Sequence, residues 1–416
     1  MPVYPIISGN ADGYPHSDDS TQYYVASGLG EGGFVSPEAV AQIRARDSYT
    51  WANMAVRVIT NTLTNDITPK SRVGGADGNM SVSIGAGLTG LFRDIVNSDA
   101  LVSGSLFNYQ IIVPAGGTSV IITAFASTLT TVANTTPIIV SSFPASNVIY
   151  SDGVTYYLPI VGELRASTTE AYVQYTCRVT STLSKLHSYV RANTLTTVAT
   201  IRPRIDGADI NSVISVPIAT TGLFEDAVNT DAIAIADKIC HEIDSPAGAG
   251  GCYVSFVSFQ SDSDGEWIGI GSGSLEVLND GDIKYAPISA SNDLNTTEAN
   301  TPMPVQANGT ARNMMVRISQ NSLNDVCVIR LRVNGGDVNL VISVPSATTG
   351  VFEDVVNSDA LITTDTWNWE VDASAPTIGT TRIHIIGLQF DQPAANTGIE
   401  DKSANMGAKM VGAGLL

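Results

Sequence analysis

The chain has 416 residues, of which 44% are apolar and 15% charged, and its 40 acidic and 21 basic side chains give a formal charge of −19. This composition excludes intrinsic disorder and argues against a nucleic-acid or anionic-membrane partner, which would need clustered lysine and arginine. The length predicts about three domains. No apolar run is long enough to span a bilayer, and the first twenty residues lack the basic and apolar regions of a secretory signal.

The first predicted element is an extended arm over residues 1–20. Its prolines, Pro2, Pro5 and Pro15, disfavour both a helix and a central strand. A helix is then predicted over Ser36–Arg46, with Ser36 as its cap, Pro37 in the first position and Glu38 facing its positive end. We find no counterpart of this helix further along the chain.

Four blocks of sequence then recur three times in constant register, at offsets of 132 and 128 residues. The first block is Asn61-Thr-Leu63, Asn193-Thr-Leu195 and Asn321-Ser-Leu323. The second has the form Arg-x-x-Gly-x-Asp-x-Asn and begins at Arg72, Arg204 and Arg332. The third runs from Thr to Asp over 89–94, 221–226 and 349–354. The fourth is Val-Asn-Ser/Thr-Asp-Ala-Leu/Ile and begins at Val96, Val228 and Val356. A period near 130 is the size of a domain rather than of a solenoid repeat.

Within each unit the apolar residues mostly alternate, as in Ile329–Val333 and Tyr253–Phe259. Alternation, β-branched residues and turn-forming Gly, Asn and Asp predict short strands joined by hairpins. The predicted fold is therefore all-β, with three tandem β-sandwich, jelly-roll-like domains between two extended arms. The predicted boundaries are an arm over 1–20, sandwiches over 21–150, 151–281 and 282–391, and a tail over 392–416.

Acidic residues recur in every unit: Asp77, Asp209 and Asp337; Asp94, Asp226 and Asp354; Asp99, Asp231 and Asp359. Oxygen ligands on loops would suit Ca²⁺. Turn chemistry, in which the side chain bonds nearby backbone, is the favoured reading, because no spacing matches an EF-hand. Unit one also carries Arg93 where the others carry Glu225 and Glu353. A cation site would tolerate that exchange badly.

Basic residues recur in pairs, two apart and therefore on one strand face. The pairs are Lys70 and Arg72, Arg202 and Arg204, and Arg330 and Arg332. Two interpretations stay open: a contact with an acidic partner or neighbouring subunit, and a solvated strand face bonded to nearby carboxylates. Because the chain has few other basic residues, we take the six as candidate interface residues.

No motif for catalysis stands out. The histidines are His16, His187, His241 and His384, and none recurs between units. Metal-binding, phosphate-loop and nucleophile-elbow patterns are missing from the sequence. The four cysteines, Cys177, Cys240, Cys252 and Cys327, have no zinc-type spacing, although Cys240 and Cys252 could meet across a hairpin. We expect no enzymatic activity, no cofactor and no metal.

The three repeated blocks after Asn61–Leu63 resemble repeats in structural proteins of tailed bacteriophages, over less than half of the chain. The resemblance implies a virion component, most simply a capsid decoration (cement) protein held by its arms, with major capsid or tail proteins and further copies as partners. It would be made in the host cytoplasm without a signal peptide. A tail or fibre module, a carbohydrate-binding module using Trp267, Trp367 or Trp369, and a self-assembling filament or surface-layer subunit are the alternatives.

Overall fold

The fold of the chain is seen in a computed structural model. It describes residues 3–17, 19–27, 37–131, 138–144, 150–151, 153–160, 162–164, 166–262, 266–270, 272–273, 277–279, 281–288, 294–373 and 379–392. Almost all regular structure in these ranges is β-strand, and the helical elements are three single turns of 3-10 helix. The helices in this part of the chain are all too short to cross a membrane.

The first unit is a sandwich of two antiparallel sheets. One sheet has the order β1 (Val3–Ser17), β9 (Ser119–Thr131), β4 (Tyr49–Asn61), β7 (Gly90–Leu101). The other has the order β2 (Ser20–Tyr24), β8 (Leu106–Val113), β5 (Lys70–Val73), β6 (Ala76–Ser81), with β3 (Ile43–Arg44) also on β8. Strands from the two ends of the unit lie side by side in both sheets, which is the eight-stranded jelly roll of two Greek keys.

The second unit repeats this strand order. Its first sheet contains β10 (Ile138–Pro144), β21 (Gly251–Ser261), β15 (Ser181–Asn193) and β19 (Gly222–Ile233). The sheet continues beyond β10 through β13 (Gly162–Leu164) to β23 (Ser272–Gly273), and β11 (Tyr150–Ser151) pairs with β21. Its second sheet contains β12 (Val154–Leu158), β20 (Lys238–Ser245), β16 (Ala199–Ile205) and β17 (Ala208–Asp209), with β14 (Tyr175–Thr176) on β20 and β18 (Ile214–Val216) on β16.

The third unit has the same order again. Its first sheet contains β22 (Glu266–Ile270), β32 (Thr380–Asp391), β27 (Gly309–Asn321) and β30 (Gly350–Leu361), with β24 (Val277–Asn279) on β32. Its second sheet contains β25 (Asp282–Pro287), β31 (Thr366–Ala373), β28 (Cys327–Val333) and β29 (Gly336–Val344), with β26 (Met303–Pro304) on β31. The predicted all-β fold of three tandem jelly rolls is confirmed.

The predicted N-terminal arm is wrong. Residues Val3–Ser17 form β1, which pairs along β9 with a register shift between Gly9 and Tyr14. Proline is compatible with an edge strand because the outer side of such a strand needs no N–H donors. By strand pairing, the jelly rolls run from β1 to β9, β10 to β21 and β22 to β32, so each begins earlier than the boundary predicted for it. Beyond Gln392, the predicted tail lies outside the described residues.

The predicted helix over Ser36–Arg46 is also wrong. Only Glu38–Val40 is helical, as the 3-10 turn η2, and Ile43–Arg44 is strand β3. Ser36 lies outside the described residues, and the N-cap position belongs to Pro37 without a side-chain cap. The turn does have counterparts, η3 (Glu170–Tyr172) and η4 (Glu298–Asn300), at the same offsets as the repeats.

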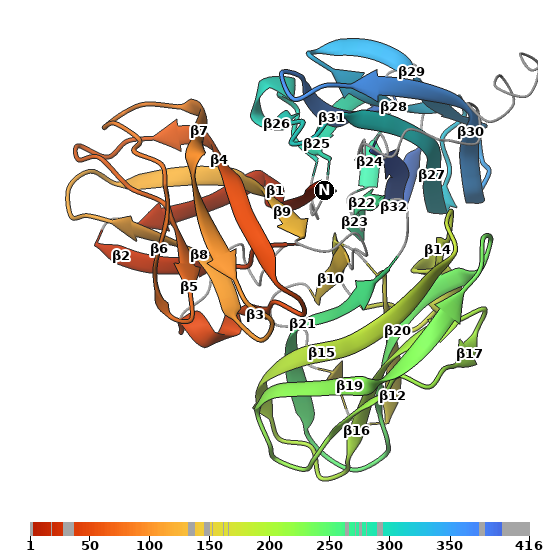
Figure 1. The fold of residues 1–416 in the computed structure, drawn as a ribbon. Helices are drawn as coiled ribbons and strands as arrows, with labels where there is room; N and C mark the ends of the chain where they lie inside the picture. The colour runs from red at the N-terminus through yellow and green to blue at the C-terminus, as the bar shows by residue number, and fades with distance from the viewer. Residues whose placement is uncertain are drawn as a thin grey trace, which may run out of the picture.

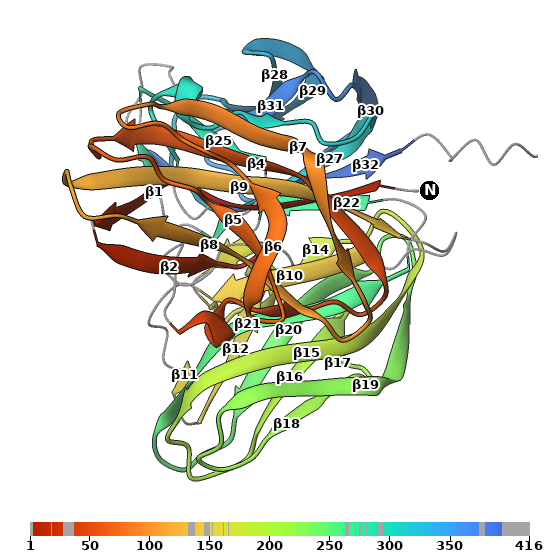
Figure 2. The same cartoon turned by 60° about the vertical axis from the view of Figure 1, so that its left-hand side comes forward.

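The three jelly rolls close into a ring. Figure 1 shows them around a common centre, with β9, β10 and β22 reaching toward it, and Figure 2 shows the same packing from a second direction. Each 3-10 turn after the first contacts the next sandwich: η3 contacts β27, and η4 contacts β4. Buried side chains of the first unit, including Ile7 and Ala126, share one core cluster with the third. The chain therefore has a pseudo-threefold arrangement in which the third unit packs back on the first.

The hairpin after each repeated arginine depends on positive φ angles. The two central residues have φ of 61° and 81° at Gly74 and Gly75, 50° and 79° at Asp206 and Gly207, and 52° and 74° at Asn334 and Gly335. Two successive positive φ values define the type I′ turn, whose twist suits antiparallel strands and which favours Gly-Gly, Asp-Gly and Asn-Gly. The turn places each repeated arginine directly opposite an aspartate, Arg72 facing Asp77 and Arg332 facing Asp337.

Candidate functional site

The second arginine of each basic pair lies at the centre of an ionic cluster on the second sheet of its jelly roll. Arg72 contacts Glu38 of η2 through two bonds of 2.9 and 3.1 Å, Asp77 across the hairpin, and the carbonyl of Gly75. These hydrogen bonds, led by those of Glu38, raise the pKa of Arg72. The 3-10 turn is thus fastened to the sheet by a bidentate carboxylate–guanidinium pair.

The same cluster recurs in the other two units with one addition. Arg204 contacts Glu170 and Asp209, and Arg332 contacts Glu298 and Asp337. Glu242 and Glu370 join them, each contacting both arginines of its unit, where the first unit has Gln110. Burial raises the pKa of Glu370, and the two arginines oppose that rise.

All six candidate interface residues therefore have carboxylate partners inside their own jelly roll. Their side chains are 13% to 22% exposed, and the first member of each pair, Lys70, Arg202 or Arg330, contacts the hairpin aspartate. This geometry satisfies the positive charges without a partner subunit. The assignment of these six residues to a subunit contact stays a prediction.

The repeated Asp94, Asp226 and Asp354 hold a looped segment of the edge strand. Asp94 accepts bonds from the backbone N–H groups of Ser81, Val96 and Asn97 at 2.9 to 3.1 Å, and from the Asn97 side chain. Burial alone would raise the pKa of Asp94, but these hydrogen bonds outweigh it and lower the pKa. Asp226 and Asp354 make equivalent bonds.

The third repeated set, Asp99, Asp231 and Asp359, joins the two sheets of each sandwich. Asp99 accepts the backbone N–H of Asn79 at 2.6 Å and the hydroxyl of Ser71 at 2.5 Å. Asp231 and Asp359 receive the backbone N–H of Asn211 and Asn339 in the same way. The carboxylates of these last two sets bond backbone N–H groups within their own jelly roll. No group of three or more His, Cys, Asp or Glu in the described ranges could hold a metal ion.

Each looped segment presents one apolar tip to solvent. In the pairing of β4 with β7, Ser98 lies opposite Ala52 and Asp94 opposite Met54, so residues 95–97 face Asn53 alone. Val96, Val228 and Val356 at these tips are 87%, 88% and 88% exposed. Sequence reasoning treated this block only as turn chemistry. The sequence signal for these exposed tips was a valine at the same position in all three repeats, between the aspartate and the asparagine that hold the loop.

The first two seams between neighbouring jelly rolls have the same ion pair at equivalent positions, and the third seam has different side chains there. At the first seam, between units one and two, Arg46 contacts Glu225 at 2.5 Å and His187 at 3.3 Å. At the second seam, between units two and three, Arg178 contacts Glu353. At the third seam, between units three and one, the equivalent residues are Gln306 and Arg93. The exchange of glutamate for arginine at position 93 thus accompanies the loss of arginine at position 306.

The histidines and cysteines are all buried. His16, His187 and His241 are 0% exposed and His384 is 7% exposed, and burial lowers the pKa of all four. Cys240 and Cys252 are not bonded to each other, and all four cysteines are free and buried. Burial raises the pKa of Cys252 to about 11, which leaves its thiol protonated and a poor nucleophile at neutral pH.

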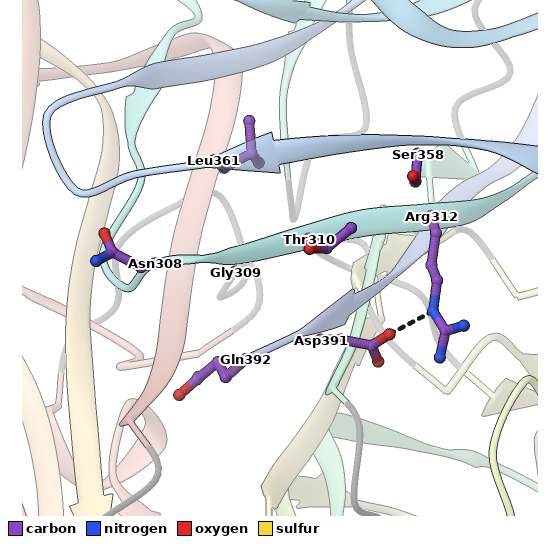
Figure 3. A pocket seen from close by; sticks show the side chains of 8 residues that line it. All are labelled: Asn308, Gly309, Thr310, Arg312, Ser358, Leu361, Asp391 and Gln392. Atoms are coloured by element: carbon purple, nitrogen blue, oxygen red, sulfur yellow. Dashed lines mark ion pairs between the residues drawn. The ribbon is translucent and has the colours of Figure 1, made fainter. Parts of the chain in front are cut away.

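An open pocket lies at the end of the third jelly roll. It has a volume of about 530 Å³ and is lined by residues in or directly beside β27, β30 and β32, including Asn308, Leu361 and Gln392. Figure 3 shows the ion pair of Arg312 and Asp391 at one side of this pocket. The pocket is located where the described chain ends, and its lining contains no paired acid and base suited to catalysis.

Two tryptophans proposed for sugar stacking are buried. Trp367 is 1% exposed and Trp369 is 0% exposed, and the indole N–H of Trp369 donates to the carbonyl of Ile288. A buried ring offers no face to a sugar. The side chain of Trp267, in β22, lies outside the described residues.

Comparisons with known proteins return weak similarities to viral structures. No family model and no curated protein matches the chain. Among solved structures, one similar chain comes from an archaeal virus described for its triple jelly-roll fold and turret assembly, with 15% identity, a TM-score of 0.20, and coverage of 93% of this chain and 91% of that one. Another comes from Sulfolobus Turreted Icosahedral Virus, with 16% identity, a TM-score of 0.19, and coverage of 83% and 80%. TM-scores this low carry no argument about fold or function.

Proposed function

We propose that the protein is a non-enzymatic structural component of a virus particle, a capsid decoration protein that docks its pseudo-threefold body on the shell. The observation that carries this proposal is the set of exposed tips Val96, Val228 and Val356. Three such tips, related by the ring, can meet three equivalent sites at once. A partner with threefold symmetry is the kind of surface that such a set fits.

The energetics support docking through all three tips together. Burying one exposed valine contributes about 1.5 kcal/mol, and three contacts on one rigid body add to an avidity that none supplies alone. The loops that carry the tips are already held by Asp94, Asp226 and Asp354, so little conformational entropy is lost on docking.

The test is binding of purified protein to particles that lack it, measured by co-sedimentation. We expect Val96→Ser to weaken binding about tenfold and the triple substitution at Val96, Val228 and Val356 to abolish it. Val102→Ser is the matched control, because Val102 is 65% exposed but lies outside the tips. Unchanged binding of the triple variant would contradict the proposal.

The role of the terminal segments needs separate variants. Deleting residues 1–20 would remove β1 from its sheet and so would test folding rather than anchoring. Deleting residues 393–416 leaves every described strand intact and tests whether the tail contributes to attachment. Electron microscopy of particles with bound protein distinguishes a position on the capsid from one on the tail.

A further inference from the structure

The second seam contains a cluster of two arginines and one histidine that has no part in the proposed docking. Arg317 lies on β27 of the third jelly roll. Arg382 and His384 lie two residues apart on β32 of the same jelly roll. Tyr172 of η3, from the second jelly roll, stacks on the ring of His384 with a centroid distance of 5.3 Å and an interplanar angle of 24°. Side chains from two domains therefore meet at one place.

Three polar atoms of this cluster are buried without a hydrogen-bond partner among the described residues. The Nε atoms of Arg317 and Arg382 and the Nδ1 atom of His384 are buried and make no hydrogen bond. Neither guanidinium is in an ion pair with any residue that the structure describes. Burial of His384 lowers the pKa of its ring to about 4, and the positive charges of Arg382 and Arg317 add to this effect. Buried donors of like charge that no described carboxylate neutralises are unfavourable, and an anion would relieve both costs.

This composition is particular to the third unit. The three units can be aligned through an equivalent backbone hydrogen bond in each. This bond joins Thr62 to Ser119, Thr194 to Gly251 and Ser322 to Thr380. The positions equivalent to those of the cluster hold Arg57, Ile121 and Thr123 in the first unit, and Tyr189, Tyr253 and Ser255 in the second. The first seam therefore has no arginine at these positions, and the third has one. The cluster is not a general feature of the jelly roll.

We propose that Arg317, Arg382 and His384, with Tyr172 as an aromatic wall, form a binding site for a small tetrahedral oxyanion such as phosphate at the seam between the second and third jelly rolls. Guanidinium groups bind oxyanions through pairs of parallel N–H bonds, and a protonated imidazole adds a further donor. The bound anion would supply the negative charge that no described carboxylate provides there, and it would fasten η3 to the sheet of the third unit. The site acts on the ring itself and is independent of docking on a shell.

The experiment is isothermal titration of the purified 416-residue protein with inorganic phosphate, and with chloride at matched ionic strength. We expect saturable phosphate binding with one site per chain, about tenfold weaker in Arg317→Gln and in Arg382→Gln. Arg312→Gln is the control, because Arg312 is on the same strand but already contacts Asp391. Unfolding midpoints in chloride establish that the variants fold.

A second readout follows the imidazole directly. Binding of phosphate beside His384 should raise the pKa of its ring from about 4, measured by NMR of ¹³C-labelled histidine and assigned with His384→Asn. Phosphate that neither binds saturably nor moves the His384 resonance would overturn the proposal, as would binding that both arginine variants retain in full. None of these outcomes depends on particles, so the result is separate from the test of the proposed function.

Discussion

Nη1 of Arg46 lies 2.5 Å from Oε2 of Glu225, and this pair joins the first jelly roll to the second. The arginine side chain is 6% exposed and the glutamate 36%. The ε nitrogen of the same guanidinium contacts His187 at 3.3 Å. The pair is therefore partly buried, and Arg46 depends on Glu225 for its counter-charge.

Replacing Glu225 by Gln should lower the free energy of unfolding by about 2 kcal/mol, because it leaves the buried guanidinium of Arg46 without a counter-ion. Arg44→Gln is the control. Arg44 also reaches Glu225, at 3.4 Å, but is 32% exposed, and its loss should cost well under about 1 kcal/mol. Chemical denaturation followed by tryptophan fluorescence measures both. Equal effects of the two variants would show that burial of Arg46 is unimportant.

The double variant Arg93→Glu with Gln306→Arg should give the third seam the pair that the other two have. We expect Gln306→Arg alone to destabilise the protein, since it places two arginines at facing positions, and the double variant to recover that loss and add about 0.5 kcal/mol. The coupling free energy from a double-mutant cycle is the measurement. Strictly additive effects would mean that positions 93 and 306 do not meet.

Arg332→Ala should destabilise the third jelly roll by about 3 kcal/mol, because it leaves Glu298 and Glu370 partly buried without their shared cation. If the repeated arginines act inside each unit, the variant should bind particles as well as the unsubstituted protein does once both are folded. Thermal unfolding gives the first quantity and co-sedimentation below the midpoint the second. Normal stability combined with lost binding would instead assign Arg332 to a subunit contact.

Stability should fall as pH drops from about 6.5 toward 4. An unfolded histidine takes up a proton near pH 6.5. Burial holds the pKa of His16 and His384 at about 4 and that of His241 at about 3. Protons therefore bind the unfolded chain first, and the stability present above pH 6.5 is lost as pH falls through this window. Below it, the lowered pKa values of Asp94, Asp226 and Asp354 add a further loss.

Unfolding free energies measured by urea denaturation at several pH values check this dependence. His241→Leu should flatten the slope by about one proton, because neither ring nitrogen of His241 has a hydrogen-bond partner and the apolar replacement cannot titrate. A slope that stays the same in this variant would mean that His241 is protonated in the folded protein.

The repeated architecture could be predicted from the sequence because alternation and turn residues act locally. Asp206-Gly207 and Asn334-Gly335 specify type I′ hairpins through their own φ preferences. The prediction of a helix over Ser36–Arg46 is wrong because intrinsic helix propensity contributes less than tertiary contacts do. Here Ile43 and Arg44 pair with β8 as a strand instead. The three-residue turn in this segment could have been found, since Glu38, Glu170 and Glu298 each precede a repeated arginine by 34 residues.

The seams and tips could not be predicted in the same way. The contact of Arg178 with Glu353 spans 175 residues, and nothing local in either segment indicates the other. The exchange at Arg93 was visible as an exception among the repeats, but its meaning depends on the ring that places Gln306 in the preceding unit. The exposure of Val96 likewise depends on the register of β7 against β4.

Because one chain supplies all three jelly rolls, its three seams are free to differ. In a homotrimer every substitution would appear three times, so a change such as that at Arg93 would alter all interfaces together. A fused ring can instead diversify one facet and leave the other two intact. On a site with threefold symmetry the fused ring could bind in three orientations, each rotated by one jelly roll. Only the side chains that differ between its units would distinguish these orientations.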